Sequence, residues 1–150
     1  MKRILSTLCL LTFVTISCDK DEDSKDYTTV ELLTASKWNL IDYYNEYYDN
    51  DTLNYTNLYD QIGPCIEDNE LQFNLDSSLS YIANNPCSSG DVDLMGTWSL
   101  NDEETKIILD YTYPWEYNIV SISMDELIIS DTLAFQSDNM FILQVSKYTR

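Results

Sequence analysis

Histidine is absent from the 150-residue chain, and this absence removes several kinds of catalytic site. Ser-His-Asp and Cys-His catalysis need an imidazole as general base, and catalytic zinc sites usually bind the metal through imidazoles. Neither a G-x-S-x-G nor a P-loop pattern occurs. The acidic pairs Glu67-Asp68 and Asp91-Val92-Asp93 fit solvated loop charges better than a catalytic or calcium site. We therefore expect no enzymatic activity, no cofactor and no metal.

Positive charge is also scarce, because 8 Lys and Arg stand against 26 Asp and Glu. The resulting net charge of −18 repels phosphate backbones, so we expect no nucleic-acid partner. The same charge favours solubility and attracts cationic proteins. Glycine is rare as well, and the three glycines form no phosphate-binding cluster.

The chain begins with a segment typical of secretion. Met1-Lys2-Arg3 is basic, and the apolar run Ile4–Ile16 that follows carries no charge. This pattern predicts a signal peptide over residues 1–17. The run is too short to cross a bilayer of about 30 Å as a helix.

The end of this segment, Thr15-Ile16-Ser17-Cys18, resembles the lipobox of bacterial lipoproteins. That resemblance implies that Cys18 is diacylated and becomes the new N-terminus, and two acyl chains anchor stably. The alternative is an ordinary signal peptide with a cysteine there by chance. If Cys18 is lipidated, residues 18–27 form a lipidated acidic tether. The tether resembles the export signal of Bacteroidetes surface lipoproteins, which implies an outer-membrane lipoprotein, surface-exposed rather than facing the periplasm.

Four cysteines occur, and two of them remain after processing. Cys9 leaves with the signal peptide and Cys18 carries the lipid, so Cys65 and Cys87 are left in an oxidising compartment. We predict a disulfide between them, contributing about 3 kcal/mol on the chain-entropy account. A metal or redox site would need more ligands or a C-x-x-C pattern, and neither is present.

Residues 28–150 have the length and patterning of one β-rich domain. Thr28 and Glu31 fit a capping box, which predicts a short helix over residues 30–35. Alternating apolar and polar residues then predict strands, separated mostly by tight turns. The expected strands span residues 38–48, 70–75, 79–83, 97–100, 107–111, 117–122, 126–136 and 140–148. A meander of eight strands can close on itself and hide its edges.

Several segments of this domain resemble the lipocalin-like domain of Bacteroidetes lipoproteins. Ser36-Lys37-Trp38 is similar to the lipocalin G-x-W opening, with serine in place of glycine. The other matching parts are Cys65, Asn69–Asn74, Cys87, Gly96-Thr97-Trp98-Ser99-Leu100, Ile119-Val120 and Lys147–Arg150. The resemblance implies an all-β fold, a small eight-stranded antiparallel up-and-down β-barrel with a short N-terminal helix. A tyrosine-rich insertion at residues 47–60 departs from that pattern.

Aromatic residues are the remaining candidates for a binding site. Tyrosine pairs an apolar face with a polar tip and is frequent at binding surfaces, although it also favours strands. We select Tyr44 and Tyr47 from the tyrosine-rich region, and Trp115, which follows Pro114 in an expected loop. Trp38 and Trp98 are expected in the barrel core.

Two classes of function fit these observations. The first is a lipid-anchored lipocalin-like protein of the cell envelope that binds a small apolar ligand, since eight strands enclose room for one such molecule. The second is a filled barrel that acts through its surface, as an inhibitor of a cationic secreted enzyme such as lysozyme or as a glycan-binding protein. A gap in the interior favours the first, and a completely filled interior favours the second.

Overall fold

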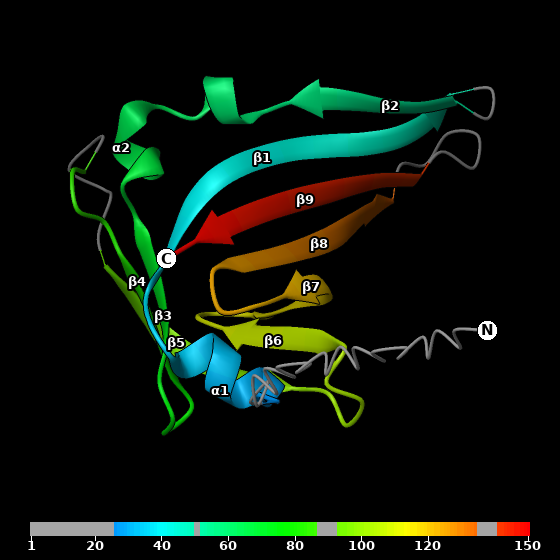
Figure 1. Cartoon of the computed structure of the whole chain (residues 1–150). Coiled ribbons are helices and arrows are strands. Elements are labelled where there is room, and N and C mark those ends of the chain that lie inside the picture. Colours follow the sequence, from blue (N-terminus) through cyan, green and yellow to red (C-terminus); the bar gives the residue numbers. More distant parts are fainter. Residues whose placement is uncertain (1–25, 50–51, 87–92, 135–140) are drawn as a thin grey trace, which may run out of the picture.

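The computed structural model describes residues 26–49, 52–86, 93–134 and 141–150 (Figure 1). Strands dominate, and three short helical segments accompany them. The strands are β1 Trp38–Asp49, β2 Thr52–Asn57, β3 Glu70–Phe73, β4 Ser78–Ile82, β5 Leu94–Leu100, β6 Lys106–Asp110, β7 Pro114–Ile122, β8 Glu126–Ala134 and β9 Phe141–Thr149. The helices are α1 Thr29–Thr34, α2 Pro64–Glu67 and a 3-10 turn at Tyr59–Gln61.

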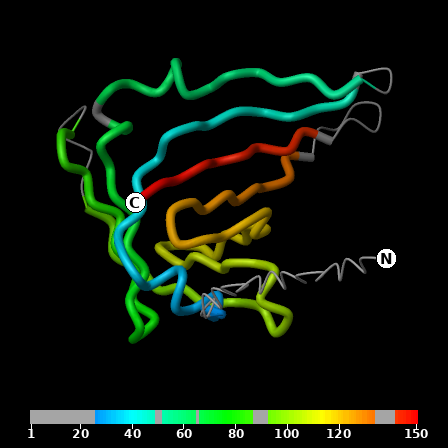
Figure 2. The backbone as a smooth tube through the Cα atoms, in the orientation of Figure 1, coloured from blue at the N-terminus to red at the C-terminus, as the bar shows by residue number. Residues whose placement is uncertain are grey.

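The strands form one antiparallel sheet that closes into a barrel (Figure 2). Consecutive strands from β3 to β9 are neighbours, and β9 pairs with β1 along nearly its whole length. The closed barrel therefore consists of β1 and β3–β9. The eight-stranded antiparallel up-and-down barrel predicted from the sequence is confirmed.

β2 is an additional strand that the sequence did not predict, and it lies within the tyrosine-rich insertion at residues 47–60. Only two residue pairs join β1 to β3, and β2 pairs with the remainder of that edge of β1, from Tyr44 to Asp49. Nearly all β2 side chains are exposed. The strand therefore shows no alternation between a buried and an exposed face, which is the signal that sequence patterns detect.

The helix α1 closes one end of the barrel. Its predicted capping box is present, with the Glu31 amide donating to the Thr28 hydroxyl at 3.2 Å. Leu33 is fully buried, and the Trp38 indole donates to the Leu33 carbonyl at 3.0 Å. Arg150 lies 4.5 Å above the Trp38 ring and donates to the carbonyl of Leu32. The helix, the first strand and the last residue are thus tied together.

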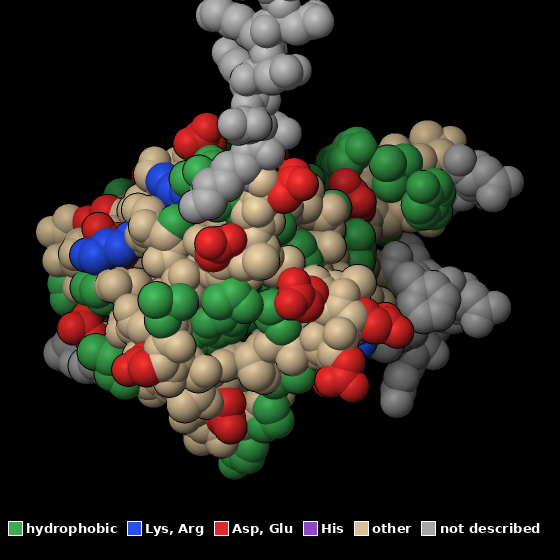
Figure 3. Space-filling model, turned by 60° about the horizontal axis from the view of Figure 1, so that its bottom comes forward, with side chains coloured by type: hydrophobic (Ala, Val, Ile, Leu, Met, Phe, Trp, Pro, Cys, Tyr) green, Lys and Arg blue, Asp and Glu red, His purple; other side chains and the backbone are tan. Residues whose placement is uncertain are grey.

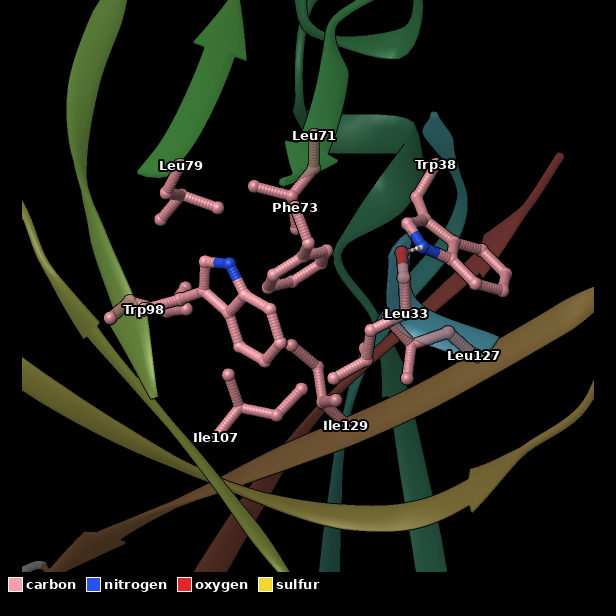
Figure 4. Close-up of a cluster of buried hydrophobic side chains, with 10 residues drawn as sticks. Leu33, Trp38, Leu71, Phe73, Leu79, Trp98, Ile107, Leu127 and Ile129 are labelled. Carbon is pink, nitrogen blue, oxygen red and sulfur yellow. Dashed lines mark hydrogen bonds between the residues drawn. The ribbon is translucent and has the colours of Figure 1, made fainter. Parts of the chain in front are cut away.

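The core lies beside this helix (Figure 4). Phe73 meets Trp98 edge to face, with ring centroids 5.4 Å apart. Trp38 and Trp98 are both buried, which confirms their expected place in the core. Leu75, which the alternation assigns to the buried face of its strand, is 79% exposed, so that assignment is wrong. The reason is that β3 ends at Phe73 and Leu75 lies in the turn that leads to β4.

Three predictions fall outside the described residues. The signal peptide and Cys18 belong to residues 1–25, and Cys87 belongs to residues 87–92. The lipid anchor and the Cys65–Cys87 disulfide therefore stay predictions. A comparison of intact masses before and after reduction would test the disulfide. Within the described part of the chain, no helix is long and apolar enough to span a bilayer.

Candidate ligand-binding cavity

A cavity of about 200 Å³ lies inside the barrel. Its lining comes from or directly adjoins seven of the eight barrel strands, β3 to β9, and side chains from so many strands can meet only in the interior. The lining residues are Leu71, Tyr81, Leu94, Leu109, Tyr111, Tyr117, Ile129 and Tyr148. The cavity borders the apolar core, because Leu71, Leu109 and Ile129 belong to both. The barrel is therefore filled next to α1 and hollow farther along.

Four tyrosines give the cavity its polar groups. Burial raises the pKa of Tyr111, Tyr117 and Tyr148, so each phenol is neutral at physiological pH. Tyr111 and Tyr117 each also raise the pKa of Tyr148, which indicates that the hydroxyls lie near one another. The lining is otherwise made of leucine and isoleucine. The cavity is therefore apolar with a few hydroxyl groups.

A carboxylate lies on the same inner surface, close to this tyrosine cluster. Leu127 and Ile129 are buried on the inner face of β8, so strand alternation places Asp131 on that face too. The charge of Asp131 contributes to raising the pKa of Tyr117. The electrostatic potential near the cavity is consequently unfavourable to an anion.

Trp115, one of the three residues selected from the sequence, lies at the edge of this region. It pairs with Leu109 across β6 and β7, and it lines a hollow of about 150 Å³ with Leu109, Tyr111 and Tyr117. These three residues also line the main cavity, so the two spaces adjoin. Trp115 is 54% exposed as expected, but it lies at the start of strand β7 and not in a loop. Pro114 can begin a strand because it needs no amide donor there.

Tyr44 lies on the outside of the barrel, in a groove of about 380 Å³. The groove is formed by Asp42, Tyr44, Tyr55, Asn57, Ile128 and Lys147, from β1, β2, β8 and β9. The outer position of the groove follows from strand alternation. Ile128 and Lys147 are each adjacent in sequence to a residue that faces inward, so both face outward. Tyr44 and Tyr55 meet edge to face at 5.9 Å. The Lys147 ammonium binds the Glu126 carboxylate at 2.5 Å.

Tyr47, the third selected residue, joins neither place. It lies on the opposite face of β1 from Tyr44 and is half-buried. Neither the interior cavity nor the outer groove includes it. The structure thus separates three residues that the sequence grouped only by residue type.

The four cavity tyrosines were not selected from the sequence, although strand alternation pointed to one of them. Tyr111 follows Ile107 and Leu109 at a spacing of two, which assigns it to the buried face. Tyr117 pairs with Ile107 across β6 and β7, so it lies on the same buried face, but this follows only once the register of the two strands is known. Among the described residues, no group of three or more His, Cys, Asp or Glu side chains is placed to hold a metal.

Comparison with known proteins gives only distant structural likenesses. No protein-family model and no curated protein matches the sequence. A DUF4847 family protein from Bacteroides vulgatus has a TM-score of 0.48 at 14% identity, over 81% of this chain and 96% of that one. Bovine odorant binding protein with undecanal has a TM-score of 0.43 at 16% identity, over 86% and 77% of the two chains. The same bovine protein with a selenium-containing odorant has a TM-score of 0.44 at 14% identity, over 84% and 75%. Likenesses at this level carry no information about function, which depends on this chain's own residues.

Proposed function

We propose that this protein is a non-enzymatic binding protein of the cell envelope that holds one small, largely apolar molecule inside its barrel. The observation that carries the proposal is the hollow beyond the packed core, lined by aliphatic and tyrosine side chains. A concave apolar site with a few convergent polar groups is the usual form of a small-molecule site.

The alternative of a completely filled barrel agrees less well with this interior. Trp38, Phe73 and Trp98 fill only the part of the barrel next to α1. Beyond them, the side chains of Tyr81 and Tyr111 border empty space. An engineered apolar cavity of about 150 Å³ in another protein binds benzene, so a space of this size is sufficient for a small aromatic molecule.

Native mass spectrometry of protein purified gently from its own host tests the proposal. We expect an additional mass that disappears when the protein is denatured. The variant Leu94→Trp should abolish this mass, because Leu94 lines the cavity and is 44% exposed, so that a larger side chain can enter from the rim. Met95→Trp is the matched control, since Met95 is adjacent, 66% exposed and not part of the lining.

Two outcomes of this experiment argue against the proposal. One is a bare polypeptide mass that stays bare after incubation with small aromatic compounds. The other is an additional mass that survives equally in Leu94→Trp and Met95→Trp, because the ligand would then lie elsewhere.

The outer groove favours a second candidate function, binding of a neutral sugar. Sugars present an apolar face to aromatic rings, here Tyr44 and Tyr55, and their hydroxyls both donate and accept hydrogen bonds. Asp42 can accept and Lys147 can donate at the same groove. A cation would meet Lys147 and an anion would meet Asp42, so an uncharged polyhydroxy compound fits best.

A glycan array with the wild type and Tyr55→Ala tests this candidate. We expect retention of a neutral glycan by the wild type and its loss in the variant, because Tyr55 is 61% exposed and contributes its ring to the groove. Silence of the wild type on the array would remove this function and leave the interior cavity unaffected.

A further inference from the structure

We infer that the ligand of the interior cavity is an uncharged single-ring molecule with one hydrogen-bond acceptor, such as an aryl ketone, received by the hydroxyls of Tyr111 and Tyr117. The inference rests on the proposed function and specifies the chemistry of the same site. It follows from which hydroxyls are available, which charges surround them and how much space they enclose.

The availability of hydroxyls differs among the four tyrosines. Tyr81 accepts a hydrogen bond from the Asn69 side-chain amide at 2.7 Å, and Tyr148 is hydrogen-bonded to Ser146. The hydroxyls of Tyr111 and Tyr117 make no such bond to any other described residue. Neither hydroxyl is among the fully buried polar atoms without a partner in the described part of the chain, so water can reach both. A ligand that displaces this water must replace its hydrogen bonds, which an acceptor atom does for both hydroxyls.

The charges around the cavity exclude an anion and give a cation no direct partner. Asp131 lies on the inner surface near Tyr117, and no Lys or Arg is part of the lining. A carboxylate ligand would thus be desolvated without a cationic partner and beside a like charge. The lining itself contains no carboxylate to neutralise an ammonium group. A neutral acceptor, such as a ketone oxygen, avoids both costs.

The volume limits the size of the ligand. An engineered apolar cavity of about 150 Å³ holds one benzene molecule. At about 200 Å³, the present cavity has room for one ring with a short substituent. Acetophenone and cumene are therefore suitable probes, because they have nearly the same shape and differ mainly in whether they carry an acceptor oxygen.

Isothermal titration calorimetry of the purified protein with four probes tests the inference. Acetophenone is the neutral acceptor, cumene the apolar match, benzoate the anion and 1-phenylethylamine the cation. We expect acetophenone to bind about tenfold more tightly than cumene, as one net hydrogen bond provides. Benzoate should not bind measurably, and the amine should bind more weakly than acetophenone.

Removing the hydroxyls separately tests their role. In the double variant Tyr111→Phe, Tyr117→Phe, both rings remain but the hydroxyls are removed. The affinity for acetophenone should fall to that for cumene, while the affinity for cumene should stay unchanged. Tyr113→Phe is the matched control, since Tyr113 lies in the turn between Tyr111 and Tyr117 and is 73% exposed. The wild-type ratio of acetophenone to cumene decides the question even if the double variant does not fold.

The outcomes distinguish the inference from the proposed function. Equal affinities for acetophenone and cumene, unchanged in the double variant, would overturn the inference and leave an apolar binding site. Tighter binding of benzoate or of the amine than of acetophenone would overturn it as well. Failure of all four probes to bind would contradict both the inference and the proposed small-molecule site.

Discussion

Gly96 shows, at the scale of a single residue, how closely two strands approach at the cavity. A Cβ atom at this position would lie 2.3 Å from the Asp110 carbonyl oxygen and 3.0 Å from Cδ1 of Tyr111. Real Cβ atoms do not come so near a backbone oxygen, so one of the two strands would have to move. Only glycine allows β5 to approach the end of β6 this closely. The same close approach positions the Tyr111 ring.

Gly96→Ala should therefore weaken both the fold and the cavity. We expect the free energy of unfolding in urea to fall by about 1–3 kcal/mol, as overpacking of a well-packed site does. Thr97→Ala, at the exposed neighbouring position, should cost less than about 1 kcal/mol. Equal stability of Gly96→Ala and the wild type would show that the strands separate without cost.

Tyr148 should make the protein less stable in alkali. Burial raises its pKa above the ordinary value of 10.0, so the unfolded chain loses this proton at a lower pH than the folded chain does. The stabilisation is complete below about pH 10 and is lost as the pH rises above it, by at most about 1.4 kcal/mol per pH unit. Urea unfolding of Tyr148→Phe should show a weaker decline over this range. A decline identical to that of the wild type would contradict the predicted contribution, and Tyr113→Phe serves as the exposed control.

At the scale of elements, β2 has one paired edge and one free edge. The Leu58 amide donates to the Tyr43 carbonyl at 2.9 Å, and Tyr44 lies opposite Asn57. In an antiparallel ladder, backbone groups alternate in direction, so the amide of Asn54 points toward β1. The amide of Leu53 points to the other side, where β2 pairs with no strand of the described sheet.

Two proline substitutions test this assignment of the edges. Asn54→Pro removes a hydrogen bond to β1 and should open the β1–β2 hairpin, seen as faster hydrogen exchange at Asn45 and Tyr47, whose amides face β2. Leu53→Pro removes an amide from the free edge and should leave exchange in β1 nearly unchanged. The reverse order of effects would mean that β2 pairs in a register shifted by one residue.

At the scale of the whole molecule, acidic side chains are spread over the surface. Figure 3 shows them scattered between apolar and polar side chains on one face, with few basic groups beside them. The chain as a whole carries a net charge of −18. Charge distributed in this way keeps a protein soluble and repels anionic surfaces. A membrane association would consequently depend on the lipid predicted at Cys18.

Cys18→Ser tests that dependence. We expect the wild type to fractionate with membranes and to carry the mass of two acyl chains at its new N-terminus. The serine variant should lack the acyl chains and leave the membrane fraction, because serine cannot accept the thioether-linked lipid. Membrane association of the unmodified variant would show that another part of the chain is the anchor.

The sequence by itself determined two kinds of element: strands in which apolar and polar side chains alternate, and the helix that begins with a capping box. Thr28 and Glu31 define the start of α1 through local hydrogen bonds. Trp98 and Leu109 lie on buried faces of strands whose polar neighbours face water. Local periodicity and one buried face per strand were enough to predict a meander of about eight strands, and the resemblance to lipocalin-like domains implied that it closes into a barrel. β2 escaped prediction because it is stabilised by its ladder with β1 and has no buried face.

The tertiary structure alone decided which tyrosines face the interior. Trp38 and Leu40 face inward, and strict alternation would place Tyr44 on the same side. A register irregularity between Leu40 and Asp42 shifts the alternation by one residue, so Tyr43 faces inward and Tyr44 faces the outer groove. A shift of one residue moves every later side chain of a strand to the other face. Since such a shift depends on pairing with distant β9, only the closed barrel fixes which tyrosines of β1 face its interior.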